Sequence, residues 1–201
     1  MKILSLKSSI LREFSVSNSL VDQINVHLKN KYVDVTIIEK DLGQNPPKHL
    51  NLAVANAVRT NDTSALTQEQ KQEYQAILDA IAELKEADII VIGAPMYNLT
   101  ISSNLKTWVD QICQAGLTFS YTAQGPKGLV NNKQVIIASS QGGIYSQPPA
   151  SHIEHQESYL KAVLGLIGVE NIQVIRAEGT NVNEETRQHS LEQAKKTIAQ
   201  L

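Results

Sequence analysis

Hydrophobic and polar residues follow two periods along this chain, one that suits buried strands and one that suits amphipathic helices. Residues 89–94 (IIVIGA) are apolar without interruption, which indicates a strand buried on both faces, as in a parallel sheet. Elsewhere, apolar residues recur every three or four positions, as on one face of a helix. The clearest such stripe lies within residues 67–86 and comprises Tyr74, Ile77, Leu78, Ile81 and Leu84.

Five strand patterns and five helix patterns alternate along the chain. Strands are predicted over residues 2–6, 33–39, 88–93, 134–139 and 172–177, and helices over residues 17–30, 67–86, 103–114, 152–167 and 183–199. This alternation predicts an α/β fold with a parallel sheet covered by helices on both faces. The flavodoxin-like, doubly wound arrangement with strand order 2-1-3-4-5 is the commonest five-stranded solution. We expect a single domain over residues 1–201.

Two segments are longer than this minimal fold needs. Residues 41–66 contain Pro46-Pro47 and a short helical pattern at 50–58, and are otherwise expected to form an extended loop. Residues 117–121 (LTFSY) alternate between apolar and polar positions and are flanked by glycines, which predicts a short hairpin or an extended loop. Long loops in compact domains commonly act as lids or interface elements.

Composition excludes several classes of partner. The net charge of −2 suggests neither nucleic acid nor an anionic membrane as a partner. The lone Cys113 rules out an intrachain disulfide and fits a reducing compartment. Neither a signal-peptide pattern nor an apolar run of about 20 residues is present. We therefore expect a cytoplasmic protein that does not enter the membrane.

Three loops leave the carboxyl ends of predicted strands, where open α/β sheets bind their ligands. Residues 8–18 contain several serines directly before a helix, whose free N–H groups favour a phosphate. The chain has neither G-x-G-x-x-G nor G-x-x-x-x-G-K-[ST], so a monophosphate held by serines is favoured over a dinucleotide or a nucleoside triphosphate. The uncharged residues after strand 88–93 suit a flat, partly apolar ligand, and Gly142-Gly143 lets the backbone approach it.

Each of these features also has an ordinary structural explanation. Ser15 or Ser17 can be a helix N-cap, Tyr97 can be a packing residue, and Gly142-Gly143 can form a simple turn. Their placement at one edge of one sheet favours the ligand site. Arg59 is either a surface charge or a substrate-binding anion contact near the mouth of the crevice. Zinc and serine-hydrolase chemistry are not indicated, because no Cys pair, H-E-x-x-H or G-x-S-x-G is present.

Together these residues resemble the FMN-dependent NADH azoreductases, relatives of the NAD(P)H–quinone reductases in the flavodoxin-like superfamily. The similar segments are 6–11 (LKSSIL), 15–18 (SVSN), 94–98 (APMYN), 117–121 (LTFSY), 125–129 (GPKGL) and 140–143 (SQGG). They extend over nearly the whole chain, including both long insertions. The Pro-Met-Tyr-Asn block and the later Thr-Phe-x-Tyr segment are the most specific.

The resemblance implies an FMN site. Its phosphate-binding residues are Ser9, Ser15, Val16 and Ser17; residues along one edge of the isoalloxazine are Met96, Tyr97, Asn98 and Leu99, and residues along its pyrimidine side are Ser140, Gln141, Gly142 and Gly143. Phe119 and Tyr121 correspond to substrate-pocket residues contributed across a homodimer interface. Two positions depart from the family pattern: Gln141 stands where relatives carry arginine, and Leu99 where they often carry phenylalanine.

The implied activity is a ping-pong, two-electron reduction of quinones and a reductive cleavage of aromatic azo compounds. FMN would be tightly bound, NADH would be the electron donor with NADPH left open, and no catalytic acid or base is assigned. The first alternative is a flavodoxin-type electron carrier without its own small-molecule substrate, which the small net charge and the two insertions disfavour. The second is a doubly wound protein that binds no flavin, which the absorbance of the purified protein would identify.

Overall fold

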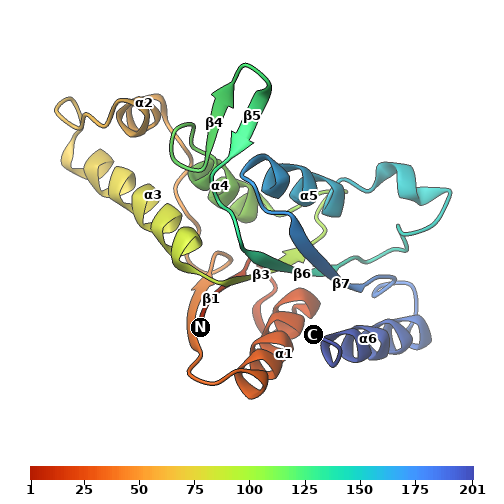
Figure 1. The fold of residues 1–201 in the computed structure, drawn as a ribbon. Helices are drawn as coiled ribbons and strands as arrows, with labels where there is room; N and C mark the ends of the chain where they lie inside the picture. The colour runs from red at the N-terminus through yellow and green to blue at the C-terminus, as the bar shows by residue number, and fades with distance from the viewer.

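A sheet of five parallel strands forms the centre of the structure (Figure 1). The computed structural model describes all residues from 1 to 201. The strands are β1 (Lys2–Lys7), β2 (Thr36–Asp41), β3 (Ile89–Pro95), β6 (Gln134–Ser140) and β7 (Asn171–Ala177), and they lie in the order β2-β1-β3-β6-β7. Numbered within this sheet alone, the order is 2-1-3-4-5, which confirms the predicted arrangement.

The central strand β3 places one of the three loops that were expected to bind a ligand. All seven of its residues are buried, because both faces of this strand are covered by helices. It pairs in parallel with β1, where Ile3 lies opposite Ile89, and with β6, where Pro95 lies opposite Ser140. The loops that follow these three strands therefore leave the same edge of the sheet.

Helices cover both faces of this sheet (Figure 1). On one face lie α1 (Val16–Lys31) and α6 (Glu184–Ile198), and on the other lie α3 (Gln68–Glu86), α4 (Ser103–Ile112) and α5 (Glu157–Leu166). The short helix α2 (Leu52–Thr60) lies beside α3, and two 3₁₀ turns are η1 (Arg12–Phe14) and η2 (Ala150–Ile153). Each face has its own cluster of buried apolar side chains. Membrane crossing requires more length and apolar character than any of these helices has.

The helix ends follow signals that are visible in the sequence. The hydroxyl of Thr67 accepts a hydrogen bond from the backbone N–H of Gln70, and the Gln70 side chain accepts one from the N–H of Thr67. This reciprocal pair is the predicted capping box of α3. Gly168 lies just beyond α5 with a φ of 102°, a left-handed conformation that ends the helix.

Several predicted boundaries were wrong by a few residues. The strand predicted over 33–39 is displaced to β2, because Asp34 adopts a φ of 55° and interrupts the extended chain. The helix predicted over 152–167 begins only at Glu157. There the Glu154 carboxylate accepts hydrogen bonds from the N–H groups of Gln156 and Glu157, so residues 150–153 form a separate turn. The helix predicted over 103–114 ends at Ile112.

The second insertion forms the hairpin that its alternating pattern predicted. Strands β4 (Phe119–Thr122) and β5 (Gly125–Gly128) pair in an antiparallel manner and project from the main sheet near α4 (Figure 1). The base of the hairpin lies against the end of α5, where Val130 N–H donates to the Ile167 carbonyl at 2.8 Å. Gly128 makes this approach possible, since a Cβ there would lie 2.2 Å from the Gly168 backbone.

A buried ion pair joins α5 to β7. The Arg176 guanidinium donates to both carboxylate oxygens of Glu157, at 2.7 and 2.6 Å. Burial is the largest single influence and opposes ionisation of Glu157, but the hydrogen bonds and positive charge of Arg176 outweigh it and lower the pKa of this carboxyl. A lowered carboxyl pKa adds stability above the pKa of the unfolded chain, and this contribution disappears as the pH falls through the folded pKa.

Glu157→Gln is expected to lower the free energy of unfolding by about 1–3 kcal/mol at neutral pH, because it leaves Arg176 without its partner charge. This loss is smaller than for a fully buried pair because the Arg176 side chain is 36% exposed and solvent screens its charge. Urea denaturation at neutral and acidic pH measures the effect. The difference in the free energy of unfolding between variant and wild type should become smaller in acid, where Glu157 is protonated. The matched control Glu192→Gln, at an exposed position of α6, should change little at either pH; an equal effect in both variants would contradict the prediction.

Candidate active site

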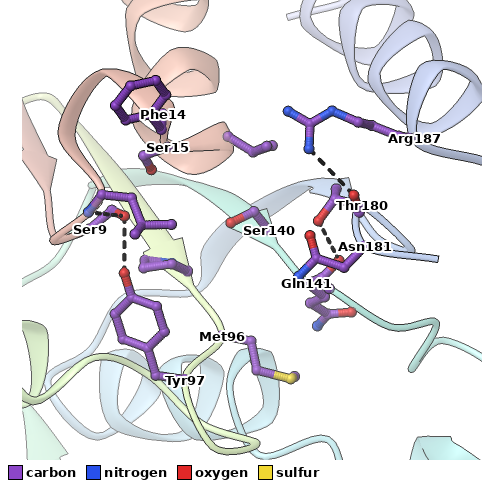
Figure 2. A pocket seen from close by; sticks show the side chains of 14 residues that line it. Ser9, Phe14, Ser15, Met96, Tyr97, Ser140, Gln141, Thr180, Asn181 and Arg187 are labelled. Atoms are coloured by element: carbon purple, nitrogen blue, oxygen red, sulfur yellow. Dashed lines mark hydrogen bonds between the residues drawn. The ribbon is translucent and has the colours of Figure 1, made fainter. Parts of the chain in front are cut away.

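The three predicted loops meet around a cavity of about 140 Å³ at the carboxyl edge of the sheet (Figure 2). Eight of the predicted cofactor-binding residues line it: Ser9, Ser15, Val16, Met96, Tyr97, Ser140, Gln141 and Gly142. The wall is completed by six residues that were not predicted, namely Leu11, Phe14, Pro95, Thr180, Asn181 and Arg187. The sequence therefore located the cavity correctly but described only part of its wall.

The start of α1 provides a cradle of hydroxyl and N–H groups. Ser15 is the N-cap, and its Oγ accepts a hydrogen bond from Asn18 N–H at 3.2 Å. The Ser15 and Ser17 hydroxyls lie 3.1 Å apart and share a hydrogen bond. The N–H groups of the first helical residues, Val16 and Ser17, have no carbonyl within the helix to bond. Together with the positive end of the helix dipole, they favour an anion at this point.

The loop after β1 is held close to β3. Ser8 donates from its Oγ to the Gly93 carbonyl at 2.6 Å, and the Ser9 hydroxyl lies 3.1 Å from the Tyr97 hydroxyl. Figure 2 shows Ser9 and Tyr97 joined in this way on one side of the cavity. The contact links the anion cradle to the loop after β3, so the two predicted parts of the site form one continuous surface.

The loop after β3 turns tightly at Asn98 and Leu99. Tyr97 and Thr100 exchange two backbone hydrogen bonds, of 2.8 and 3.2 Å, around these residues. Both turn residues have positive φ angles, of 49° and 71°, as the common two-residue hairpin turn requires. Leucine in this left-handed region is strained, and strain of this kind is typical of functional sites. The N–H groups of Asn98 and Leu99 make no hydrogen bond within the chain, so they are available to a ligand.

The Gly142-Gly143 loop is held in place by the segment after β7. Asn181 N–H donates to the Gly142 carbonyl at 2.9 Å, and Gly179 N–H donates to the Gly143 carbonyl at 2.8 Å. A Cβ at Gly142 would lie 2.8 Å from the Asn181 side chain, so glycine lets these segments approach. The N–H groups of Gly142 and Gly143 make no hydrogen bond within the chain. Gly142 lines the cavity and Gly143 follows it, so these two donors lie at or next to the cavity wall.

Gln141 supports the floor of the cavity and carries no charge. Its side chain is 1% exposed, and its Nε2 donates to Gln156 Oε1 at 3.0 Å. Gln156 in turn donates to the Ala94 carbonyl at the end of β3. The Oε1 atom of Gln141 is buried without a hydrogen-bond partner. The side chain at this position is thus an amide held in an uncharged hydrogen-bond network.

A second and larger cavity, of about 760 Å³, adjoins the first at Tyr97, which lines both. Its walls combine apolar and aromatic groups with a few polar ones: Ile10, Tyr97, Asn98, Thr100, Ile101, Ser103, Lys106 and Tyr159. Burial and, to a smaller extent, the charge of Asp110 raise the pKa of Tyr159 to about 12, so its hydroxyl stays protonated at neutral pH. This volume falls within the range of about 300–1,000 Å³ typical of ligand pockets.

Other predicted residues lie outside these two cavities. Ser17 and Gly143 lie directly behind lining residues, and Leu99 occupies the strained turn. Phe119 is 7% exposed and belongs to the core, whereas Tyr121 beside it is 77% exposed. Arg59 lies on α2, where it donates to Asn56 at 3.1 Å. Within one chain, the structure does not bring these last three residues to the cavities.

Sequence reasoning missed one wall because it considered the loops after only three strands. Thr180, Asn181 and Arg187 follow β7, whose carboxyl end lies at the same edge of the sheet. The same rule about strand ends therefore pointed to this loop as well. Phe14 gave no comparable signal, since an aromatic residue in a polar loop has no periodicity.

The whole chain, residues 1–201, matches the protein family described as having a flavodoxin-like fold. An FMN-dependent NADH:quinone oxidoreductase of Idiomarina loihiensis is 46% identical over 198 residues, which cover 98% of each chain. A protein of the same name from Azospirillum brasilense is 43% identical, over 98% of this chain and 96% of its own.

Two solved structures of azoreductases have a fold similar to that of this chain. A crystal structure of an FMN-dependent NADH-azoreductase from Bacillus anthracis, in complex with FMN, superposes with a TM-score of 0.89 at 27% identity, covering 99% of this chain and 96% of the other. Another azoreductase from Bacillus anthracis superposes with a TM-score of 0.88 at 29% identity and covers both chains completely.

Proposed function

Because the chain belongs to the family with the flavodoxin-like fold, we propose that it uses FMN to carry electrons from NADH to quinones and aromatic azo compounds. The observation that carries this proposal is the anion cradle at α1, which continues through Tyr97 into a larger and more apolar cavity. Relatives at 43–46% identity are named FMN-dependent NADH:quinone oxidoreductases, and the similar crystal structures are those of azoreductases. A phosphate end and a flat aromatic end are the two parts that a flavin mononucleotide presents.

The residues present fit FMN. The smaller cavity is below the size of pockets that enclose whole ligands, but it suits a phosphate with its serine hydroxyls and unpaired N–H groups. The free N–H groups of Gly142 and Gly143 offer donors for the carbonyl-rich edge of a flavin ring. The N–H groups of Asn98 and Leu99 offer two more on the opposite loop. Such N–H donors suit a flavin ring, because they stabilise the negative charge that the ring gains when it is reduced.

In this arrangement the protein binds the cofactor, orients it and shields it from water. When bound, FMN would supply the group that accepts and donates hydride, which no side chain can do. Ser9, Ser15 and Ser17 with the Val16 backbone hold the phosphate. Met96 and Tyr97 border one edge of the ring. Ser140 and the loop behind it border the other edge. The apolar cavity lined by Ile10 and Tyr159 binds the flat donor and acceptor in turn and keeps water away from them.

We further propose that two copies of the chain form a homodimer in the cytoplasm. Several large apolar side chains are exposed in the single chain. Ile10, Leu11 and Phe14 line the two cavities, and Tyr121 lies on the hairpin. Exposed apolar groups of this size commonly mark an interface. Tyr121 on the projecting hairpin would then contact substrate in the site of the partner, and Phe119, whose ring packs edge to face against Tyr121 with centroids 5.4 Å apart, would support it from the core.

The test is to load the purified protein with FMN and mix it without oxygen, first with NADH and then with a quinone. We expect NADH to bleach the flavin absorbance and the quinone to restore it. NADPH in a parallel experiment compares the two donors. An aromatic azo compound in place of the quinone tests the second class of acceptor.

Two outcomes would contradict the proposal in different ways. Retained colour with both nicotinamides would identify a carrier that another protein reduces. Protein that binds no FMN at all would overturn the entire functional assignment. Equilibrium sedimentation of the same preparation tests the homodimer separately.

A further inference from the structure

Arg187 is the only charged side chain on the wall of the smaller cavity. It lies in the first turns of α6, which begins at Glu184 and is capped by Asn183. Figure 2 shows its side chain entering the cavity from α6, on the side opposite Ser9, with the guanidinium turned toward the space that Ser15 and Ser140 border. The remaining wall consists of hydroxyl, amide, thioether, aromatic and aliphatic groups.

The Arg187 guanidinium is largely unpaired. Its single hydrogen bond within the chain goes from Nη1 to the Thr180 carbonyl, at 3.3 Å. A guanidinium has five N–H donors, so most of its capacity is unused, and no carboxylate forms an ion pair with it. Arg176 provides a contrast, because its Nε and Nη2 both donate to the carboxylate of Glu157. A half-buried arginine without a counter-charge is well suited to bind an anion such as a phosphate.

The serine cradle across the cavity has hydrogen-bond donors but lacks a positively charged side chain. Ser9, Ser15 and Ser17 supply hydrogen bonds but no positive charge. A phosphate monoester carries a charge of about −1.5 to −2 at neutral pH, and no lysine lines the cavity. Gln141, which also lines this cavity, is neutral and is held by Gln156. The remaining source of compensating charge in this cavity is α6.

We propose that Arg187 binds the phosphate of FMN and supplies the positive charge that the serine cradle lacks. This inference rests on the proposed function, because it assumes that FMN occupies the site. It assigns to the loop and helix after β7 a direct part in cofactor recognition. Thr180, which accepts the present hydrogen bond from Arg187, would hold the guanidinium in place as a positioning residue.

The test compares FMN with riboflavin, which has the same ring and ribityl chain without the phosphate. Flavin is removed from the protein, and dissociation constants are measured from the quenching of flavin fluorescence. We expect Arg187→Gln to weaken FMN binding by about tenfold or more, as for a lost charge-assisted hydrogen bond. Riboflavin binding should change by less than about threefold, and Arg187→Lys should recover part of the FMN affinity.

The matched control is Lys196→Gln, which removes the same charge from an exposed position of the same helix. It should leave both dissociation constants unchanged, and thermal unfolding should show that each variant is folded. Equal losses for FMN and riboflavin in Arg187→Gln would overturn the phosphate assignment, and so would unchanged FMN affinity. If the wild-type protein bound neither flavin, the proposed function itself would fail, so the two failures are distinguishable.

Discussion

Ser15→Asp is expected to weaken FMN binding by about a hundredfold or more while leaving the fold intact. Aspartate is as good a helix N-cap as serine, and its charge is favourable at the start of α1. The same charge would stand in the cradle where the phosphate is proposed to bind. Two like charges about 4 Å apart repel by several kcal/mol in a partly buried site. Flavin fluorescence titration of the flavin-free protein measures the loss.

The control for Ser15→Asp is Thr67→Asp, which introduces the same residue at the N-cap of α3, far along the chain from the cavity. FMN affinity should be unchanged in this variant. The affinity for riboflavin should fall much less than the affinity for FMN on going from wild type to Ser15→Asp, because riboflavin lacks the phosphate that the aspartate repels. If Ser15→Asp bound FMN as tightly as wild type does, the phosphate would not bind at the start of α1, and the proposed cradle would be wrong.

The sequence predicted the sheet and the location of the site because both follow from local patterns. The apolar run at 89–94 indicates a strand buried on both faces, and in a parallel sheet the carboxyl end of such a strand lies beside those of its neighbours, as the structure shows. Serines before a helix define an anion site without knowledge of the rest of the fold. These features needed no long-range information.

What remained hidden depends on contacts between distant segments. The rule about strand ends points to the loop after β7, but Arg187 lies beyond that loop in α6, and only the packing of this helix places its side chain on the cavity wall. The pairing of Gln141 with Gln156 depends on how α5 packs against the end of β6. The late start of α5 has a local cause instead, because the Glu154 carboxylate accepts hydrogen bonds from the N–H groups of Gln156 and Glu157 and so competes with the helical pattern upstream.

The hairpin is a second place where the packing of distant segments decides the outcome. Its base rests on a glycine-to-glycine contact: a Cβ at Gly128 would lie 2.2 Å from the Cα and N atoms of Gly168 and 2.4 Å from the Ile167 carbonyl carbon. These are backbone atoms, so a larger side chain cannot be accommodated by rotating a neighbour. Gly128 also pairs with Phe119, whose ring is buried in the core.

Gly128→Val is therefore expected to push the hairpin away from α5 and to lower the free energy of unfolding by about 3 kcal/mol or more, at the upper end of overpacking effects. Urea denaturation measures this loss. The control is Gly165→Ala in α5, where a Cβ meets nothing within 4 Å; it should raise stability by about 0.5–1 kcal/mol. Because the hairpin carries Phe119 and Tyr121, Gly128→Val should also lower kcat/KM for quinone reduction more than it weakens FMN binding. A stable variant with normal quinone reduction would show that the hairpin neither rests on this contact nor borders the substrate.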